Sequence, residues 1–92
     1  MLSKIPIELQ KIEKGVLDKE ILRSGIIAEL EAINLYEQMA AIAEGKNIKR
    51  SLVDIAKEEK THVGELQALL LEKDKEQETE LEEGKREIKE KT

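Results

Sequence analysis

The chain has 92 residues, no cysteine and one aromatic residue, and 40% of its residues are charged, with a formal net charge of −5. The absence of cysteine excludes disulfides and thiolate metal sites, and the interspersed basic residues lack the positive stripe typical of nucleic-acid-binding proteins. No apolar run approaches the roughly 20 residues that span a bilayer, and the N-terminus lacks a signal-peptide core, so we expect a cytoplasmic protein without membrane contact.

The lack of Phe and Trp and the abundance of Lys and Glu favour long helices with ionic surfaces, which indicates an all-α fold. A chain of this length is near the lower limit for burying a sufficient core alone, so self-association is expected. Any metal would be held by carboxylate, imidazole or carbonyl groups, which suit iron, manganese or zinc.

Residues 1–17 are predicted to form a lead-in in which Pro6 and Gly15 limit any helix to a few turns. An unbroken helical pattern follows over 18–44. Gly45 is suited to the left-handed cap that ends many helices.

The second helix is predicted from Ile48 to about Lys73, with Asn47 as its N-cap. Because the connection 45–47 is short, the two helices should be antiparallel neighbours. Residues 18–73 are therefore predicted to form one helical hairpin.

The C-terminal segment 74–92 has only Leu81 and Ile88 as sizeable apolar residues, with Gly84 between them. We expect a solvated, fraying helix or a disordered tail. Such a charge run is typically a soluble surface, and the alternative is a spacer or docking arm.

Each predicted helix of the hairpin carries one inward-facing stripe at helical spacing. On the first helix the stripe comprises Leu22, Ile26, Glu29, Ile33, Tyr36 and Ala40, and on the second it comprises Leu52, Ile55, Ala56, Glu59, His62, Val63, Leu66 and Leu69. Glu29, Glu59 and His62 thus occupy positions where apolar side chains would be expected.

A metal ion would compensate for placing these three ionisable groups in a core, because a buried carboxylate without a partner is costly. Glu59 and His62 are three residues apart, so both side chains lie on one helix face about one turn apart. Glu29 would approach from the facing helix. One chain offers two carboxylates and one imidazole, whereas a two-fold dimer offers four carboxylates and two imidazoles, the ligand set of ferritin-like di-iron proteins.

Simpler interpretations exist for each residue. A Glu-x-x-His pair is more often a surface ion pair, and a residue such as Tyr36 is more often a core residue than a neighbour of a metal site. Glu31 lies about 200° around the helix from Glu29 and is expected on an outer face. Glu58 and Lys60, which flank Glu59, are also expected on an outer face.

The segments AELEAINLYEQ (28–38) and EEKTH (58–62) resemble the encapsulated ferritins, in particular the archaeal version fused to encapsulin shell proteins. The similarity covers roughly 18–72. It implies a two-helix subunit whose dimer forms a ferroxidase centre, with five dimers in a ring. It also implies a location inside an encapsulin nanocompartment, with the shell protein as a fused or separate partner.

The resemblance implies that Glu29, Glu59 and His62 are the iron ligands and that Tyr36 lies beside the site. An outer metal position of the family uses two acidic residues, and here Glu31 matches one of them while Ala28 replaces the other. The short apolar docking peptide of free-standing members has no counterpart in the terminal sequence KREIKEKT.

The resulting hypothesis is a ferroxidase that oxidises Fe(II) at two irons per homodimer and supplies iron storage. A second hypothesis is a metal-stabilised assembly module, in which Mn or Zn occupies the same ligands without redox turnover. A third is an interaction hairpin without metal. Nucleophilic triads and Gly-rich phosphate loops are absent from the sequence, so hydrolase and nucleotide-binding functions have no support.

Overall fold

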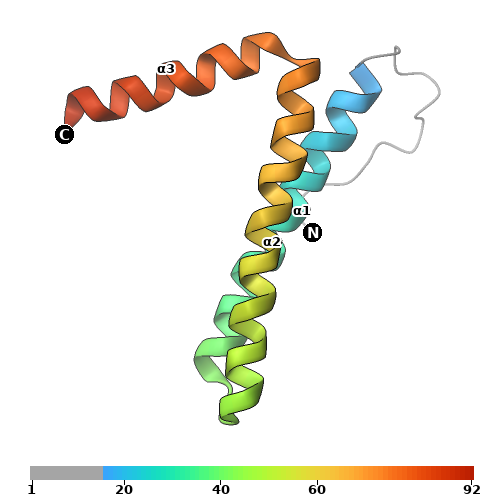
Figure 1. The fold of residues 1–92 in the computed structure, drawn as a ribbon, viewed down its shortest axis with the longest axis vertical. Helices are drawn as coiled ribbons and strands as arrows, with labels where there is room; N and C mark the ends of the chain where they lie inside the picture. The colour runs from blue at the N-terminus through green and yellow to red at the C-terminus, as the bar shows by residue number, and fades with distance from the viewer. Residues whose placement is uncertain (1–15) are drawn as a thin grey trace.

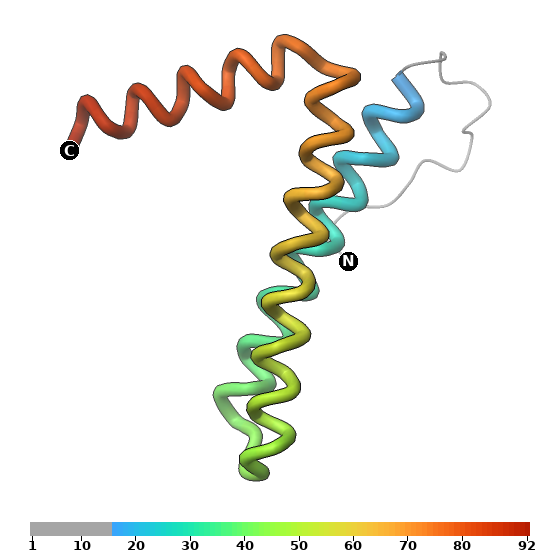
Figure 2. The backbone as a smooth tube through the Cα atoms, viewed as in Figure 1, coloured from blue at the N-terminus to red at the C-terminus, as the bar shows by residue number. Residues whose placement is uncertain are grey.

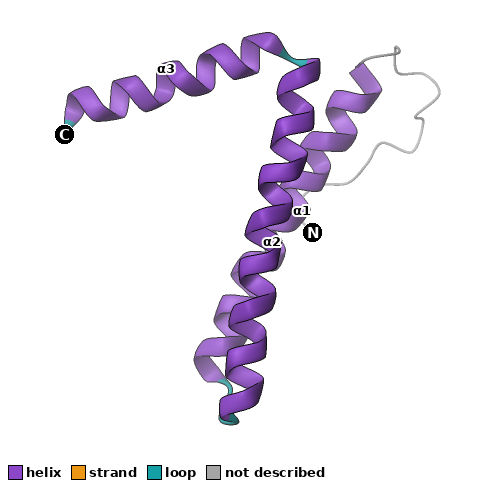
Figure 3. Ribbon diagram, in the orientation of Figure 1, coloured by secondary structure: helices purple, strands orange, loops and turns teal. Residues whose placement is uncertain are grey.

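A computed structural model describes residues 16–92, and all of its regular structure in that range is helical. The elements are α1 (Val16–Ile42), α2 (Lys46–Lys73) and α3 (Lys75–Lys91), joined by short connections (Figure 3). This confirms the predicted all-α fold. Residues 1–15 of the predicted lead-in lie outside the described residues.

Helices α1 and α2 run antiparallel along most of their lengths, as the backbone trace shows (Figure 2). The predicted helical hairpin is therefore present. Its buried apolar residues come from both helices: Ile33 and Ala40 from α1, and Ala56 and Leu70 from α2. None of the helices in the described range is long and apolar enough to cross a membrane.

The turn between α1 and α2 differs from the sequence-based prediction. Gly45 has an extended backbone (φ −74°, ψ 129°) and is the N-cap of α2, so it is not a left-handed cap, and Asn47 lies within the helix. A left-handed residue is not needed here, because the Lys49 ammonium donates to the Ala40 carbonyl at 2.6 Å. That bond satisfies an end carbonyl of α1 that a left-handed cap would otherwise serve.

Two residues of the predicted inward stripe on α2, His62 and Leu69, are exposed. Leu69 is 49% exposed, while its neighbour Leu70 is buried. The reason is the position of α3, because Leu70 lines a hollow together with Gln77 and Leu81 from the first turns of that helix. The chain therefore covers the side of α2 that carries Leu70 and leaves Leu69 uncovered.

The C-terminal segment is a helix, which settles the choice between a helix and a disordered tail. Helix α3 leaves the end of α2 at a sharp corner and extends away from the hairpin (Figure 1). At the corner, the Asp74 carboxylate accepts a hydrogen bond from the Gln77 backbone N–H at 3.0 Å, as a helix N-cap does. Gly84 lies within α3 without interrupting it.

Candidate metal centre

The hairpin brings Glu29, Glu59 and His62 together, although the first two are thirty positions apart in the sequence. Glu29 lies in the middle of α1, and Glu59 and His62 lie one turn apart in the middle of α2. The antiparallel packing of the two helices places these positions opposite one another, because each belongs to its helix's inward stripe.

The His62 imidazole lies between the two carboxylates. Its Nδ1 is 3.3 Å from Oε2 of Glu29 and 3.5 Å from Oε2 of Glu59. One ligand atom from each of the three residues lies within 4.8 Å of the other two. Ligands bound to one transition-metal ion at about 2.1 Å lie roughly 3–4 Å from one another, so small side-chain rotations would bring all three to one ion.

The cluster is open on one side. The side chains of Glu59 and Glu29 are 19% and 24% exposed, whereas that of His62 is 47% exposed. The carboxylates are thus mostly enclosed by the hairpin, and the imidazole marks the surface through which an ion could enter. The same surface is available to a second chain.

The donor chemistry fits a first-row metal ion. Carboxylate oxygen and imidazole nitrogen are ligands for iron, manganese and zinc, and the cluster contains no soft sulfur donor. Two negative carboxylates close together repel each other, and a cation between them removes that repulsion. Among the described residues, no other group brings three carboxylate or imidazole side chains this close.

Other predicted residues lie outside this cluster. Tyr36 is partly exposed two turns along α1 from Glu29, and its role beside the site stays a prediction. Glu31 is partly buried and is not a member of the cluster, and Ala28 contributes no ligand, so an outer metal position also stays a prediction.

Glu58 and Lys60, which flank Glu59, are exposed, as expected. Lys60 forms an ion pair with Glu37 of α1 at 2.9 Å.

Sequence reasoning missed one polar connection that fixes the geometry around the hairpin. The Arg23 guanidinium on α1 donates to the Asp74 carboxylate at 2.5 Å, and this pair ties the α2–α3 corner to the first helix. The sequence does contain a signal for the bond between Asp74 and Gln77, because these residues have the spacing of a capping box. The Arg23 contact has no comparable signature, since it depends on the tertiary fold.

Comparisons with known proteins give the family to which the chain belongs. The sequence model of the family named Rubrerythrin matches residues 20–92. A ferritin-like-encapsulin shell fusion protein of Pyrococcus furiosus is 62% identical over 73 residues, which are 79% of this chain and 21% of the relative. The chain therefore spans about a fifth of the length of that curated relative.

The fold is also similar to a solved structure, the crystal structure of an encapsulated ferritin domain from Pyrococcus furiosus. The TM-score is 0.77 at 50% identity, and the alignment covers 98% of this chain and 86% of that one. Family match, sequence identity and fold agree with the predicted resemblance to the encapsulated ferritins. The chain therefore belongs to the rubrerythrin family of ferritin-like proteins and is a homologue of the encapsulated ferritin domain.

Proposed function

We propose that this chain is a ferroxidase, which oxidises Fe(II) to Fe(III) at a dinuclear site formed between two copies. The observation that carries the proposal is the cluster of Glu29, Glu59 and His62, with ligand atoms within 4.8 Å of one another and one open side. Iron is the substrate here as well as the occupant of the site.

Two copies are needed because the donors of one chain are too few to enclose two ions. A two-fold axis beside the exposed His62 would add the same three donors from a partner, giving four carboxylates and two imidazoles. This is the composition of the di-iron set in ferritin-like bundles. The small core of the hairpin supports the same conclusion, because a second hairpin would cover the apolar residues that one chain leaves exposed.

The protein groups have separate tasks in this reaction. Carboxylates are hard anionic donors that favour the more highly charged ion, so Glu29 and Glu59 would stabilise Fe(III) relative to Fe(II). His62 would bind through Nδ1, the ring nitrogen that faces both carboxylates. Each Fe(II) gives up one electron, so a pair can reduce one O₂ to H₂O₂ with two protons. Manganese and zinc fit the same donors.

The proposal includes a compartment for the product. The Pyrococcus furiosus relative carries its ferritin-like part in one chain with an encapsulin shell. We place this chain in the same context, inside an encapsulin nanocompartment, with the homodimers arranged as a ring of five. The shell would receive the oxidised iron, since the described hairpin and its projecting helix offer no evident surface for closing a cage.

An anaerobic Fe(II) titration followed by exposure to oxygen tests the function. We expect binding to saturate at two irons per dimer and ferric absorbance to appear after oxygen is added. A parallel titration with Zn(II) measures binding without redox chemistry. Binding of both metals without Fe(II) oxidation by oxygen or peroxide would favour the assembly module, in which the metal only joins the chains.

A further inference from the structure

The corner between α2 and α3 consists of a single residue. Helix α2 ends at Lys73 and α3 begins at Lys75, so that Asp74 alone is outside helical conformation, with φ −137° and ψ 89°. The surrounding sequence has no helix breaker, because residues 65–83 contain neither proline nor glycine. Apart from Asp74 and Thr79, every residue in that stretch is a strong helix former. The main chain by itself therefore favours one continuous helix, and something else must hold the corner.

The main-chain hydrogen bonds at the corner are nearly those of a continuous helix. The Asp74 N–H donates to the Leu70 carbonyl at 2.9 Å, and the Glu78 N–H donates to the Asp74 carbonyl at 3.2 Å. Both bonds join residues four apart, as in an uninterrupted α-helix. In such a helix the three N–H groups between them would donate to the three carbonyls before Asp74. The bent form and a continuous helix thus differ by only a few hydrogen bonds.

The Asp74 carboxylate makes the contacts that compensate for this difference. Its Oδ1 accepts the Gln77 N–H at 3.0 Å, and its Oδ2 accepts from the Arg23 guanidinium at 2.5 Å. A residue that caps the start of a helix with its side chain has a non-helical backbone. The cap on Gln77 and a continuous helix through Asp74 therefore exclude each other.

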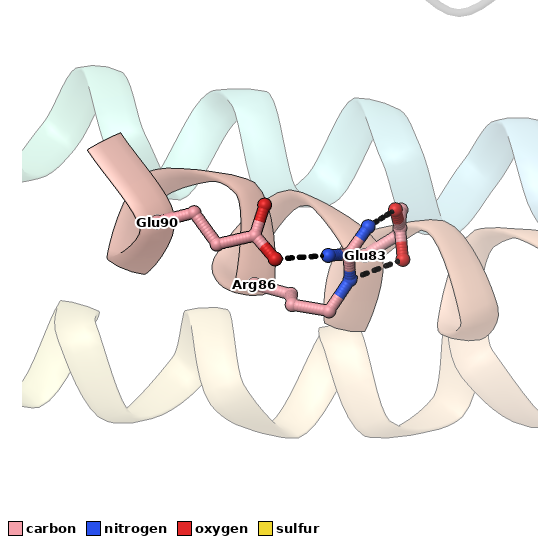
Figure 4. Close-up of polar contacts among 3 residues, drawn as sticks. All are labelled: Glu83, Arg86 and Glu90. Carbon is pink, nitrogen blue, oxygen red and sulfur yellow. Dashed lines mark hydrogen bonds and ion pairs between the residues drawn. The ribbon is translucent and has the colours of Figure 1, made fainter.

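Beyond its first turns, α3 is stabilised by contacts within itself. Arg86 bonds to Glu83 and Glu90 on the neighbouring turns of the same helix (Figure 4). Such pairs three and four residues apart stabilise a helix locally, wherever that helix points. Helix α3 extends away from the hairpin (Figure 1), so that a change of direction at the corner would break few contacts.

The bend covers an apolar part of the hairpin. A hollow of about 300 Å³ lies at the corner, with Ile26, Ile27 and Leu70 on the hairpin side and Gln77 and Leu81 on the α3 side. We refer to it as the corner hollow. In a continuous helix the first turns of α3 would extend α2 beyond the end of the hairpin, and the corner hollow would lose that wall.

We propose that the α2–α3 corner is a two-state switch, in which the Asp74 cap selects between the bent form and one continuous helix over residues 46–91. In the bent form Asp74 caps α3, and the start of α3 covers the corner hollow. In the continuous form Asp74 is helical, its cap is released, and the apolar wall on the hairpin is open. The switch is separate from the iron chemistry, because the three candidate metal ligands lie in the middle of the hairpin and keep their places in both forms.

The two forms differ in the distance between the middle of α2 and the end of α3. Lys57 and Lys89 are exposed and lie 32 positions apart, which is about 48 Å along a continuous helix and less in any bent form. The chain has no cysteine, so Lys57→Cys and Lys89→Cys place one spin label on each helix. Doubly labelled chains are diluted with an excess of unlabelled chains, so that double electron–electron resonance reports distances within one chain.

Two neutral amide substitutions separate the cap from the charge. Asp74→Asn keeps a capping side chain, whereas Asp74→Gln replaces it with a helix former that caps poorly. We expect the shorter distance to dominate in the parent and in Asp74→Asn. Asp74→Gln should add a peak near the distance of the continuous helix and raise the ratio of long to short distances several-fold. Asp74→Ala, which also lacks a cap, should behave in the same way, and circular dichroism checks that each variant is helical.

Hydrogen exchange distinguishes a straightened corner from a loosened one. In the bent form the N–H groups of Lys75 and Glu76 are the first two of α3 and have no acceptor within that helix. In the continuous form both gain carbonyl acceptors on α2, so their exchange should slow several-fold in Asp74→Gln. A parental distance distribution in Asp74→Gln overturns the proposal. So does a broadened distribution with faster exchange at these two amides, or an equal response of Asp74→Asn and Asp74→Gln.

Discussion

Arg23 and Asp74 are 51 positions apart in the sequence, yet the guanidinium of the first lies 2.5 Å from the carboxylate of the second. The same carboxylate caps α3 by accepting the Gln77 N–H. The Asp74 side chain, only 14% exposed, thus joins α1 and α3, while its backbone N–H bonds to the Leu70 carbonyl of α2. The direction in which α3 leaves the hairpin depends on this junction.

The Asp74 junction predicts an acid-dependent loss of stability. The Gln77 N–H, and then Lys19 and Arg23, hold the pKa of Asp74 below its ordinary value of 3.8. Because the folded-state pKa is the lower one, the stabilisation is complete above pH 3.8 and is lost as the pH falls through the folded-state value. Asp74→Asn keeps a capping side chain but removes the charge, so it should lower Tm by a few degrees at neutral pH.

Thermal melts of the parent and of Asp74→Asn are recorded across pH. The difference between their Tm values should be constant near neutrality and should shrink below pH 3.8. Glu76→Gln, with the same change of charge in the first turn of α3, serves as the control. A difference that stays the same down to acid pH would show that the carboxylate charge contributes nothing to the junction.

Replacing the candidate ligands should separate chemistry from folding. Removing a residue that only hydrogen-bonds to a metal ligand lowers metal affinity or activity roughly 10- to 100-fold. Removing a ligand itself should cost more, so we expect the rate of Fe(II) oxidation to fall more than about 100-fold in Glu29→Ala, Glu59→Ala and His62→Ala. Glu31→Ala, outside the cluster on α1, should keep most of the rate. Circular dichroism establishes that each variant is helical. Parental activity in the Glu29 variant would remove that residue from the site.

Chelation should loosen the dimer. In the metal-free protein, two chains that meet at the face carrying Glu29, Glu59 and His62 would bring four carboxylates together, and these repel one another. Bound metal removes that repulsion and stabilises the dimer. Metal at 100 times its Kd adds about 2.7 kcal/mol. Sedimentation and melting temperature are measured with and without chelator, and a chelator already saturated with metal serves as the control. An unchanged oligomer with an unchanged melting temperature would place the metal away from any interface.

Oxidation without storage is expected of the isolated protein. The described residues form a hairpin with a projecting helix, and ferric ions that leave the site would hydrolyse in bulk solvent. Aerobic addition of a large excess of Fe(II) should therefore produce turbidity and growing particles in light scattering. A clear solution with a mineral core inside each particle, seen by electron microscopy, would show instead that the chain builds its own container.

Much of this architecture could be predicted from periodicity. The stripes that contain Ile33, Ala40 and Ala56 identified most of the buried residues, and the same stripes placed Glu29, Glu59 and His62 together. Periodicity succeeds because the two helices pack along nearly their whole length, so that the helix face alone decides burial.

The errors arose where something other than the helix face decides the structure. Leu69 was assigned to the core in place of Leu70, because the direction of α3 determines which residue is covered. Gly45 was assigned a left-handed conformation, and the Lys49 ammonium on the following helix made that unnecessary. Both cases depend on tertiary contacts that a local pattern does not encode.

Among residues 16–92, four apolar residues are buried, and two of them are alanines, Ala40 and Ala56. An alanine contributes little apolar area, so a separated hairpin gains little free energy by closing, and a larger gain comes when other chains cover its remaining apolar surface. Folding and association then occur in one step, and the rate of that step is second order in chain concentration. After dilution from denaturant, the half-time for regaining helix should lengthen about tenfold for each tenfold reduction in chain concentration. Newly made chains would therefore reach their final structure fastest where many copies are produced close together.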